Sequence, residues 1–368
     1  MEKESKKNRR LFDKTREAKS LGELMHIREA NRERIDKIKN RGTALGFKLS
    51  KQENTKHPCI IIFVADKKDP GEFMPGVLED KNGTWCLTDV VTGGESGQII
   101  PDLLPDLSTP NKKVVGLLSS EQSKLIGGIR LAFDSGSDQD SDQEGWGTGG
   151  IAVKTGDGII GFLTNRHVAG GDNSRIIYHP HLRNSPIGIN FNPQKYSSAI
   201  DDFQKWYGMD TGYTGSFVIT DYSFIKINDS LQSNVQPGIY GIGNVGPLKR
   251  INLDTMDIIG QKIISVGAGR GIQRGTIAAF SYEWENFGLK YYTDILIIGN
   301  GTGFSSSGDS GKIIVTDDKE HRPIAIHWGG VKGVKGQFGN KTGEKQNVWG
   351  KATELGKILD STGLKILD

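Results

Sequence analysis

The uneven distribution of glycine is the strongest constraint on the fold of this chain of 368 residues. Residues 1–112 hold 9 of the 50 glycines, and residues 113–368 hold the other 41. No Gly-X-Y period is present, which excludes a collagen helix, and an apolar content of 35% is too high for a wholly disordered chain. Glycines scattered among short apolar runs are typical of turn-rich β proteins, so the sequence predicts a mainly β fold for residues 113–368.

Residues 1–43 form a basic segment with helical periodicity. Residues 1–41 carry 14 Lys and Arg against 8 Asp and Glu, whereas the whole chain has a net charge of only +3, which argues against a uniformly basic nucleic-acid-binding protein. We predict a helix over residues 11–41 that docks one apolar stripe on the body of the protein, with a nucleic-acid-binding or partner-binding arm as the alternative. The stripe consists of Leu21, Leu24, Ile27, Ile35 and Ile38.

Residues 44–112 have the pattern of a small α+β module followed by a linker. The apolar run from Cys59 to Ala65 is typical of a strand buried on both faces, and Trp85–Val91 predicts a second strand. Cys59 and Cys86 are the only cysteines in the chain, too few for a disulfide framework, and nothing about them indicates zinc. The segment contains no catalytic constellation, and we interpret residues 1–112 as a regulatory or docking region.

From residue 113 onward, about twelve short apolar runs alternate with Gly, Asn and Asp, beginning with Val114–Leu118. That number of strands suits two antiparallel barrels, at about residues 113–232 and 237–350, with a closing helix at about 351–361. One insert, residues 134–145, is acidic. Its Asp138-x-Asp140-x-Asp142 spacing resembles a calcium loop but lacks the turn glycine and the final glutamate, so we favour a flexible acidic hairpin loop.

Three short motifs contain the residue types of a nucleophilic catalytic site. Ser310 lies in the string GDSG, where flanking glycines allow the tight turn that presents a nucleophile beside backbone N–H groups. His167 follows the apolar run FLT, and Asp221 begins the alternating string DYSFIKI. The order His, Asp, Ser, with gaps of 54 and 89 residues, is that of one family of hydrolases.

Through the strings TNRHV, DYSFIKI and GDSG, residues from about 113 to 359 resemble a chymotrypsin-like (trypsin-fold) serine peptidase. The resemblance implies two six-stranded antiparallel barrels, with His167 and Asp221 from the first and Ser310 from the second. It implies that Ser310 attacks a peptide carbonyl, His167 transfers the proton, and Asp221 orients the imidazole. The backbone N–H groups of Gly308 and Ser310 would form the oxyanion hole, with no metal or organic cofactor required.

A further string, IAIHWGG at residues 324–330, is similar to the specificity strand of bacterial glutamyl endopeptidases. In that comparison His327 would help to bind an acidic side chain, with Trp328 and Gly329 beside it on the wall of the pocket. The alternative is that His327 only fills the wall. Phe304 stands six residues before Ser310, where trypsin-type enzymes carry an acid, so cleavage after Lys or Arg is disfavoured.

Two glycine-containing strings have alternative interpretations. GAGRG at residues 267–271 is similar to the barrel hairpins of microbial relatives, and it lacks the lysine-serine ending of a phosphate-binding loop. Residues 124–128 resemble the cleavage junction of trypsin-type zymogens, in which Asp309 would pair with the new N-terminus. The same glycines also suit the start of a strand.

These observations predict a serine endopeptidase that acts on protein or peptide substrates. The alternative is a protease-fold binding or scaffolding protein without turnover. The string MEKESKKNRR lacks the apolar stretch of a signal peptide, and no run approaches the roughly 18 apolar residues of a membrane span, so we expect a cytoplasmic protein with no membrane partner.

Overall fold

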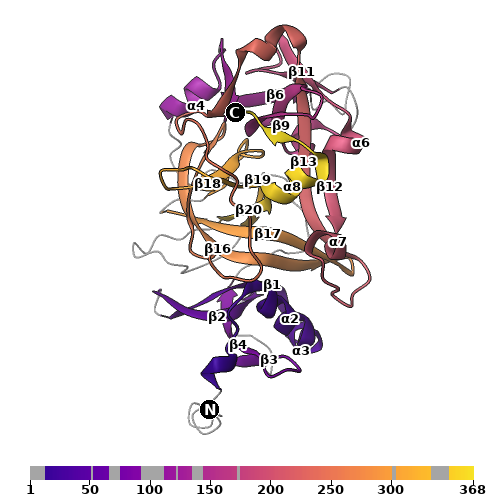
Figure 1. Ribbon diagram of the computed structural model, residues 1–368, viewed down its shortest axis with the longest axis vertical. Coiled ribbons are helices and arrows are strands. Elements are labelled where there is room, and N and C mark those ends of the chain that lie inside the picture. The colour runs from indigo at the N-terminus through magenta and orange to yellow at the C-terminus, as the bar shows by residue number, and fades with distance from the viewer. Residues whose placement is uncertain are drawn as a thin grey trace.

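The computed structural model describes residues 13–50, 53–65, 75–92, 112–121, 123–134, 144–171, 175–300, 304–332 and 348–368. The expected linker at residues 93–110 and the three aspartates Asp138, Asp140 and Asp142 lie outside these ranges. The chain is mainly β. Its N-terminal strands and helices form a smaller part that lies against one end of a larger body (Figure 1).

The N-terminal segment contains two short helices in place of the single helix expected over residues 11–41. The first begins at a capping box, in which the Ser20 hydroxyl accepts from the Glu23 N–H and the Glu23 carboxylate accepts from the Ser20 N–H. The second ends where the Asn40 side chain donates to the carbonyls of Ile35 and Ile38, and residues 40–43 already belong to a strand. All five residues of the predicted apolar stripe are buried. The elements are η1 (Lys14–Arg16), α2 (Leu21–Ala30) and α3 (Arg32–Asp36).

Four strands follow, and they continue the sheet of the body. β1 pairs antiparallel with β2 on one side and with β16 of the body on the other, where Thr43 lies opposite Glu283 and Leu45 opposite Phe280. Gly42 permits this approach, since a Cβ atom there would overlap the Glu283 carbonyl. The strands are β1 (Asn40–Ser50), β2 (Glu53–Val64), β3 (Val77–Glu79) and β4 (Trp85–Thr92).

The N-terminal strands and the body also share one apolar core. Phe63 of β2 packs edge-on against Tyr282 and Trp349 of the body, with ring centroids 5.0 and 5.7 Å away. Cys59 and Ile61 of the same strand belong to this cluster and are fully buried. Strands β1 and β2 are therefore attached to the body, the first through main-chain pairing and the second through side-chain packing.

The first part of the body differs from expectation at its start. The residues expected as a strand at Val114–Leu118 form a helix, because Val114 and Leu118 are four residues apart and so face the core together, while Leu117 is exposed. The elements of this part are α4 (Lys112–Leu118), β5 (Leu125–Gly127), β6 (Arg130–Asp134), β7 (Glu144–Thr148), β8 (Ile151–Lys154), β9 (Ile160–Thr164), α5 (Arg166–Ala169), β10 (Ile176–Tyr178), β11 (Pro186–Asn190), α6 (Pro193–Tyr196), β12 (Ser197–Asp202), α7 (Phe203–Tyr207), β13 (Ser216–Ile227), η2 (Asp229–Asn234) and β14 (Val235–Ile239).

The second part of the body contains the longest hairpin, β16 with β17, and ends in the closing helix. That helix begins at Leu355 rather than near residue 351, because residues 350–354 pair with β17 and β19. Gly363, with a φ of +71°, ends it. The elements are β15 (Lys262–Gly267), β16 (Gly271–Asn286), β17 (Leu289–Gly299), β18 (Ile313–Thr316), β19 (Pro323–Lys332), β20 (Val348–Glu354), α8 (Leu355–Thr362) and β21 (Lys365–Ile366).

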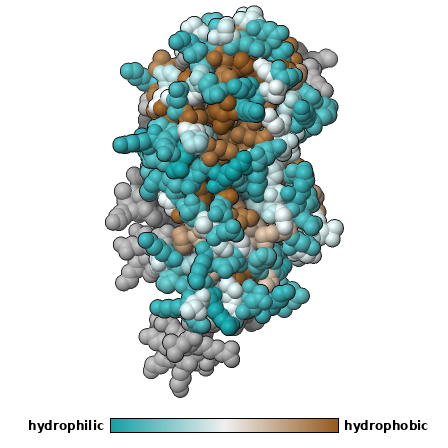
Figure 2. Space-filling view, in the orientation of Figure 1, coloured by the Kyte–Doolittle hydropathy of each residue, from teal (hydrophilic) through white to brown (hydrophobic). Residues whose placement is uncertain are grey.

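Within the described ranges, strand pairing joins both parts of the body and the N-terminal strands in one 19-stranded sheet. The two parts of the body meet where β13 runs parallel to β17, with Phe217 opposite Tyr291. The face seen in Figure 2 is mostly hydrophilic, and hydrophobic residues gather mainly in its upper half. None of the described helices is long and apolar enough to cross a membrane.

A buried acidic cluster lies where α8 meets both parts of the body. The Asp294 carboxylate accepts from Trp206 Nε1 (3.1 Å), from the Tyr207 hydroxyl and from the Glu354 N–H (2.7 Å). Burial, followed by the charge of Asp294, raises the pKa of Glu354 to about 7, although Lys357 and Arg250 act in the opposite direction. Glu354 therefore keeps its proton in the folded protein well above the usual value of 4.5.

We expect the free energy of unfolding to fall as the pH rises from about 4.5 to 7. In that range folded Glu354 holds a proton that the unfolded chain has released, and the loss should be of the order of 3 kcal/mol. Urea denaturation at pH 5 and pH 8 measures it. Glu354→Gln should flatten this decline, while Glu33→Gln on the exposed face of α3 should preserve it. An equal slope in wild type and Glu354→Gln would contradict the prediction.

Candidate functional site

His167 lies on the short helix α5, directly after strand β9. The strand brings the chain to Asn165, whose side-chain amide donates to the backbone carbonyl of Asp221 at 2.5 Å. Asn165 is the N-cap residue of α5, so this bond ties the start of the helix to strand β13. The His167 side chain is 36% exposed, which leaves one side of the imidazole open to solvent.

The Asp221 carboxylate binds His167 at two points. Its Oδ2 lies 2.6 Å from Nδ1 of the imidazole, and its Oδ1 accepts from the His167 backbone N–H at 3.2 Å. An ionised carboxylate can only accept, so in the neutral form of His167 Nδ1 carries the proton and Nε2 the lone pair. Asp221 is buried and has a φ of +35°, an uncommon conformation for a residue other than glycine.

Ser310 lies on a turn bounded by two glycines in left-handed conformations. Gly308 has a φ of +83° and Gly311 a φ of +97°. A Cβ atom on Gly308 would overlap the ring of Trp146, and one on Gly311 would overlap the Thr148 carbonyl. The turn is therefore packed closely against strand β7, and both glycines of the GDSG motif are required by space as well as by backbone conformation.

The structure brings the histidine segment and the serine turn together. A Cβ atom on Gly147 would lie 2.5 Å from Val168, the residue after His167, and 3.2 Å from the carbonyl oxygen of Ser310. Gly147 thus lies directly between the histidine segment and the serine turn, where there is no room for a side chain. The backbone of the serine turn and the segment that carries His167 therefore lie close together, although they are far apart in sequence.

Asp309 has a buried partner that the sequence analysis did not anticipate. Its Oδ2 lies 3.1 Å from Nζ of Lys312, and both side chains are fully buried. Oδ1 of Asp309 also accepts from the backbone N–H of Arg270 at 3.1 Å, in the glycine-rich hairpin between β15 and β16. In the comparison with zymogens Asp309 would pair with a new N-terminus, but in this structure it forms an ion pair with Lys312. Residues 125–127 form strand β5, which pairs with β14.

The predicted specificity residues His327 and Phe304 contact each other behind the serine turn. Their rings meet edge-on with centroids 5.9 Å apart, and both are fully buried. Nε2 of His327 lies 2.9 Å from the Ser305 hydroxyl. Burial, followed by the charge of Lys312, holds the pKa of His327 well below its ordinary value, so this imidazole is neutral.

Trp328 and Gly329 lie next along strand β19. The indole of Trp328 is 6% exposed and packs in the core shared with the N-terminal strands, with its Nε1 donating to the Thr293 hydroxyl at 3.1 Å. Lys351 lies over this ring, its Nζ 4.2 Å from the centroid. A Cβ atom on Gly329 would meet only Cε of Lys351, at 3.7 Å. The edge of the strand at Gly329 is consequently less crowded than the surroundings of Trp328.

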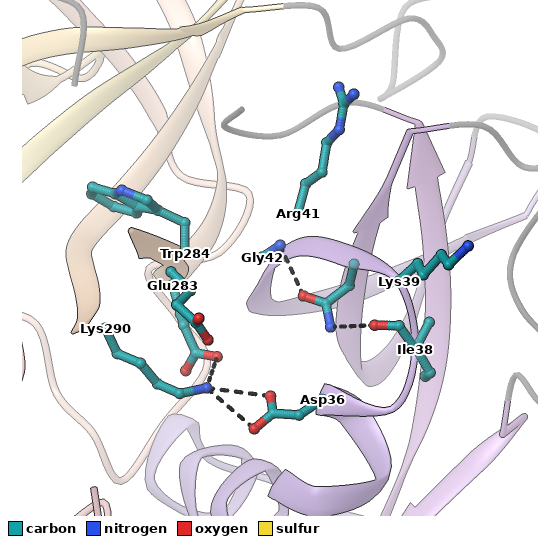
Figure 3. Close-up of a pocket in the computed structure, with 10 residues that line it drawn as sticks. Asp36, Ile38, Lys39, Arg41, Gly42, Glu283, Trp284 and Lys290 are labelled. Atoms are coloured by element: carbon teal, nitrogen blue, oxygen red, sulfur yellow. Dashed lines mark hydrogen bonds and ion pairs between the residues drawn. The ribbon is translucent and has the colours of Figure 1, made fainter. Parts of the chain in front are cut away.

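A separate pocket of about 430 Å³ lies between the N-terminal part and the β16–β17 hairpin (Figure 3). Figure 3 shows Lys290 between Asp36 and Glu283, and its Nζ lies 3.2 Å from Asp36 and 3.7 Å from Glu283. Arg28 and Arg32 also lie against Glu283, so the buried charges are paired with one another. Within the described ranges no group of three or more His, Cys, Asp or Glu could hold a metal ion.

Three residues that contact the serine turn were not predicted from the sequence: Trp146, Thr148 and Lys312. Lys312 had a detectable signal, since it is a charged residue at the start of the apolar run IIV and directly after GDSG. Trp146 and Thr148 lie in the string GWGTGG, where the glycines indicate close backbone approach without specifying the partner.

Comparison with known families divides the chain into two matched regions. Residues 16–91 match the NARROW LEAF 1 N-terminal domain, and residues 117–368 match the Nal1 C-terminal domain. The chain belongs to the NARROW LEAF 1 family. The NARROW LEAF 1 match at residues 16–91 includes both the helices and the four N-terminal strands.

Two relatives match over most of the chain. Protein NARROW LEAF 1 of Oryza sativa subsp. japonica is 32% identical over 372 residues, which cover 96% of this chain and 62% of the rice protein. A probable serine protease of Bradyrhizobium tropiciagri is 26% identical over 320 residues, 76% of this chain and 37% of that protein. The chain thus spans less than two thirds of the length of either relative.

Solved structures of serine proteases are more distantly similar. Nocardiopsis protease is 17% identical with a TM-score of 0.42, over 67% of this chain and 100% of that one. A glutamic acid-specific serine protease, described as using a histidine triad in substrate binding, is 15% identical with a TM-score of 0.42, over 66% and 100% of the two chains. This likeness concerns the fold alone.

Proposed function

We propose that this NARROW LEAF 1 family member is a serine endopeptidase with two β-barrels, in which Ser310, His167 and Asp221 form the catalytic triad. The observation that carries the proposal is the 2.6 Å contact between Nδ1 of His167 and Oδ2 of Asp221, beside the serine turn. It leaves Nε2 of His167 as the basic nitrogen that a serine hydroxyl needs. The name of the bacterial relative, a probable serine protease, agrees with this function.

In this proposal the Ser310 hydroxyl attacks a peptide carbonyl while Nε2 of His167 accepts its proton. The imidazolium so formed is stabilised by Asp221 and then protonates the leaving amine. In the second half of the reaction the imidazole takes a proton from water, and the water oxygen attacks the acyl carbon. The bond from the acyl carbon to the Ser310 oxygen then breaks, and the imidazolium protonates that oxygen. The N–H groups of Gly308 and Ser310 stabilise the negative oxygen of each tetrahedral intermediate.

For the residue before the scissile bond we propose a preference for Glu or Asp, set by a pocket wall that includes His327, Phe304, Trp328 and Gly329. The contact of His327 with Ser305 favours this preference, because a neutral imidazole and a hydroxyl that share one hydrogen bond keep one further proton to donate to a carboxylate. A neutral His327 would act through hydrogen bonding rather than through its own charge.

We further propose that the N-terminal part binds a regulatory or docking partner. The core that it shares with the body supports this role, because Trp328 of strand β19 and Phe63 of β2 belong to the same cluster. A partner that displaced β2 would disturb the packing behind the specificity strand.

The experiment that tests the peptidase is covalent labelling with a fluorophosphonate, which reacts with an activated serine. Wild type should be labelled, and Ser310→Ala should not. Ser361→Ala is the control, since it removes a serine hydroxyl on α8, outside the proposed site, and should preserve labelling. Equal labelling of wild type and Ser310→Ala would refute the peptidase and favour a protease-fold binding protein.

The specificity proposal is tested by digesting a peptide library with the purified full chain. Cuts should follow Glu or Asp in wild type, and His327→Ala should lose that preference while retaining fluorophosphonate labelling. Cuts after small or aromatic residues in wild type would overturn the acidic preference and leave the peptidase intact.

A further inference from the structure

Strand β7 contacts the serine turn through two side chains on the same face. Trp146 and Thr148 are two residues apart on a strand, so both point toward the turn. The ring of Trp146 lies where a Cβ atom of Gly308 would be, and the Thr148 hydroxyl donates to the Gly308 carbonyl at 2.7 Å. Gly308 is therefore held on its Cα side and at its carbonyl oxygen by one strand.

The direction of the Thr148 hydroxyl is determined by its surroundings. Its oxygen accepts from the backbone N–H of Ala268 at 3.0 Å, and the residue is fully buried. Because Ala268 supplies a proton, the single proton of the hydroxyl is directed to the Gly308 carbonyl. Removing the hydroxyl would leave a buried donor at Ala268 and a buried acceptor at Gly308 without their partner.

The backbone of Thr148 anchors the second residue of the oxyanion hole and the histidine segment. Its N–H donates to the Ser310 carbonyl at 2.8 Å, and its carbonyl accepts from the Thr164 hydroxyl at 2.7 Å. Thr164 is the last residue of β9, three residues before His167. Thr148 thus links the strand that leads to the histidine with both residues whose N–H groups would bind the oxyanion.

This anchoring affects the oxyanion hole because Gly308 is conformationally free. Glycine populates positive and negative φ about equally, so the φ of +83° is not imposed by its own side chain. An oxyanion donor is effective only when it lies about 2.7–3.1 Å from the developing charge. The Gly308 carbonyl and the Gly308 N–H belong to successive peptide groups joined at the Gly308 Cα. A change in ψ at an unanchored Gly308 would therefore shift the turn and move its N–H away from that position.

Resting on the proposed peptidase function, we propose that Thr148 is a positioning residue for the oxyanion hole. Its hydroxyl holds the Gly308 carbonyl and so fixes ψ at Gly308, while the Trp146 ring packs against the Gly308 Cα. Together these two contacts hold the turn in the conformation that presents the Gly308 N–H to the site. Arg130 keeps the Trp146 ring in place, since its guanidinium stacks 4.1 Å from the ring centroid and pairs with Glu144.

The test compares Thr148→Val with Thr148→Ser in the full chain. Val keeps the shape of the side chain but lacks the hydroxyl. The kcat for p-nitrophenyl acetate, divided by the concentration of sites that react with a fluorophosphonate, should therefore fall about 10- to 100-fold. A decrease of about 100-fold would equal the smaller effects seen when one oxyanion donor is removed. KM should change less than about threefold, because the ground-state ester does not use the hole fully. Ser retains the hydroxyl and should recover most of the loss.

Thr155→Val is the matched control for stability. Thr155 is also buried, and its hydroxyl accepts from the Ile159 N–H at 2.9 Å and donates to Asp157, remote from the serine turn. It should lower the unfolding temperature as Thr148→Val does and leave kcat per reactive site at the wild-type value. Equal kcat in Thr148→Val and Thr155→Val, or equal losses in the Val and Ser variants at position 148, would overturn the proposal.

A second pair of variants covers the case in which Thr148→Val does not fold. Trp146→Leu opens space at Gly308 and should lower kcat per reactive site, while Trp146→Phe keeps an aromatic ring there and should lower it less. Identical kcat values in these two variants would overturn the proposal. Failure of wild type to label at Ser310 would instead refute the peptidase function itself.

Discussion

Replacing Asp221 with Asn should lower kcat about 10⁴-fold, the size of effect seen when the acid of such a triad becomes an amide. The Asp221 carboxylate accepts from both the His167 backbone N–H and Nδ1 of the ring. In the Asp221→Asn variant the amide oxygen would remain with the backbone N–H and the NH₂ group would face Nδ1. That nitrogen would then have to accept, which moves the ring proton to Nε2 and blocks proton transfer from Ser310.

The measurement is kcat for a peptide amide cleaved by wild type, at a pH near 7. Asp317→Asn is the matched control, because Asp317 pairs with Arg274 at the surface and lies outside the site. It should retain wild-type kcat within about twofold, as expected of a surface substitution away from the site. A decrease of less than about tenfold for Asp221→Asn would show that Asp221 does not orient the imidazole.

Replacing Glu283 with Gln should destabilise the folded protein by about 3–5 kcal/mol, the usual cost of removing one partner from a buried ion pair. Glu283 is 4% exposed and lies against Arg28, Arg32 and Lys290. The first two come from helix α2 and its continuation α3, so the carboxylate joins the N-terminal part to strand β16. Gln would leave these buried cations without their main counter-charge.

The same carboxylate should make stability depend on pH below about 4.5. Burial alone would raise the pKa of Glu283, but the charges of Arg32, Arg28 and Lys290 outweigh it and hold the pKa well below the usual 4.5. The unfolded chain therefore binds a proton first as the pH falls, and the stabilisation present above pH 4.5 is lost progressively below it. Glu283→Gln should abolish this part of the pH dependence.

Urea denaturation at pH 7 and at pH 3.5 measures both effects. Glu285→Gln is the control, since Glu285 lies two residues along the same strand with an exposed side chain. It should change stability by no more than about 0.5 kcal/mol. If Glu283→Gln destabilised the protein by no more than the control variant does, the buried cluster would not hold the N-terminal part on the body.

Local sequence was sufficient for the residues whose role depends on neighbours in the chain. The GDSG string requires glycine at two positions, and both have positive φ in the structure. The apolar run at residues 59–64 is a strand buried on both faces, with every residue fully buried. These features could be predicted because turn geometry and continuous burial act over a few residues.

Local sequence was not sufficient where two structures compete for one segment. The short apolar run Val114–Leu118 was expected to form a strand, but it forms helix α4. In the helix Val114 and Leu118 lie on the same face and pack together against the core. The segment at residues 40–43 was expected to end a helix, yet it opens strand β1 because β16 offers main-chain partners. Propensity is a weak preference that such contacts override.

The glycine distribution, the order of His167, Asp221 and Ser310, and the apolar periodicities were determined by the sequence alone, since each depends on residue type and spacing. Only the tertiary structure decided that Thr148 anchors Gly308, and that the N-terminal strands share a sheet and a core with the body. Thr148 is 160 residues from Gly308 in the sequence. Hydrogen bonds and ion pairs across such separations depend on which strands lie side by side, and no local preference specifies that arrangement.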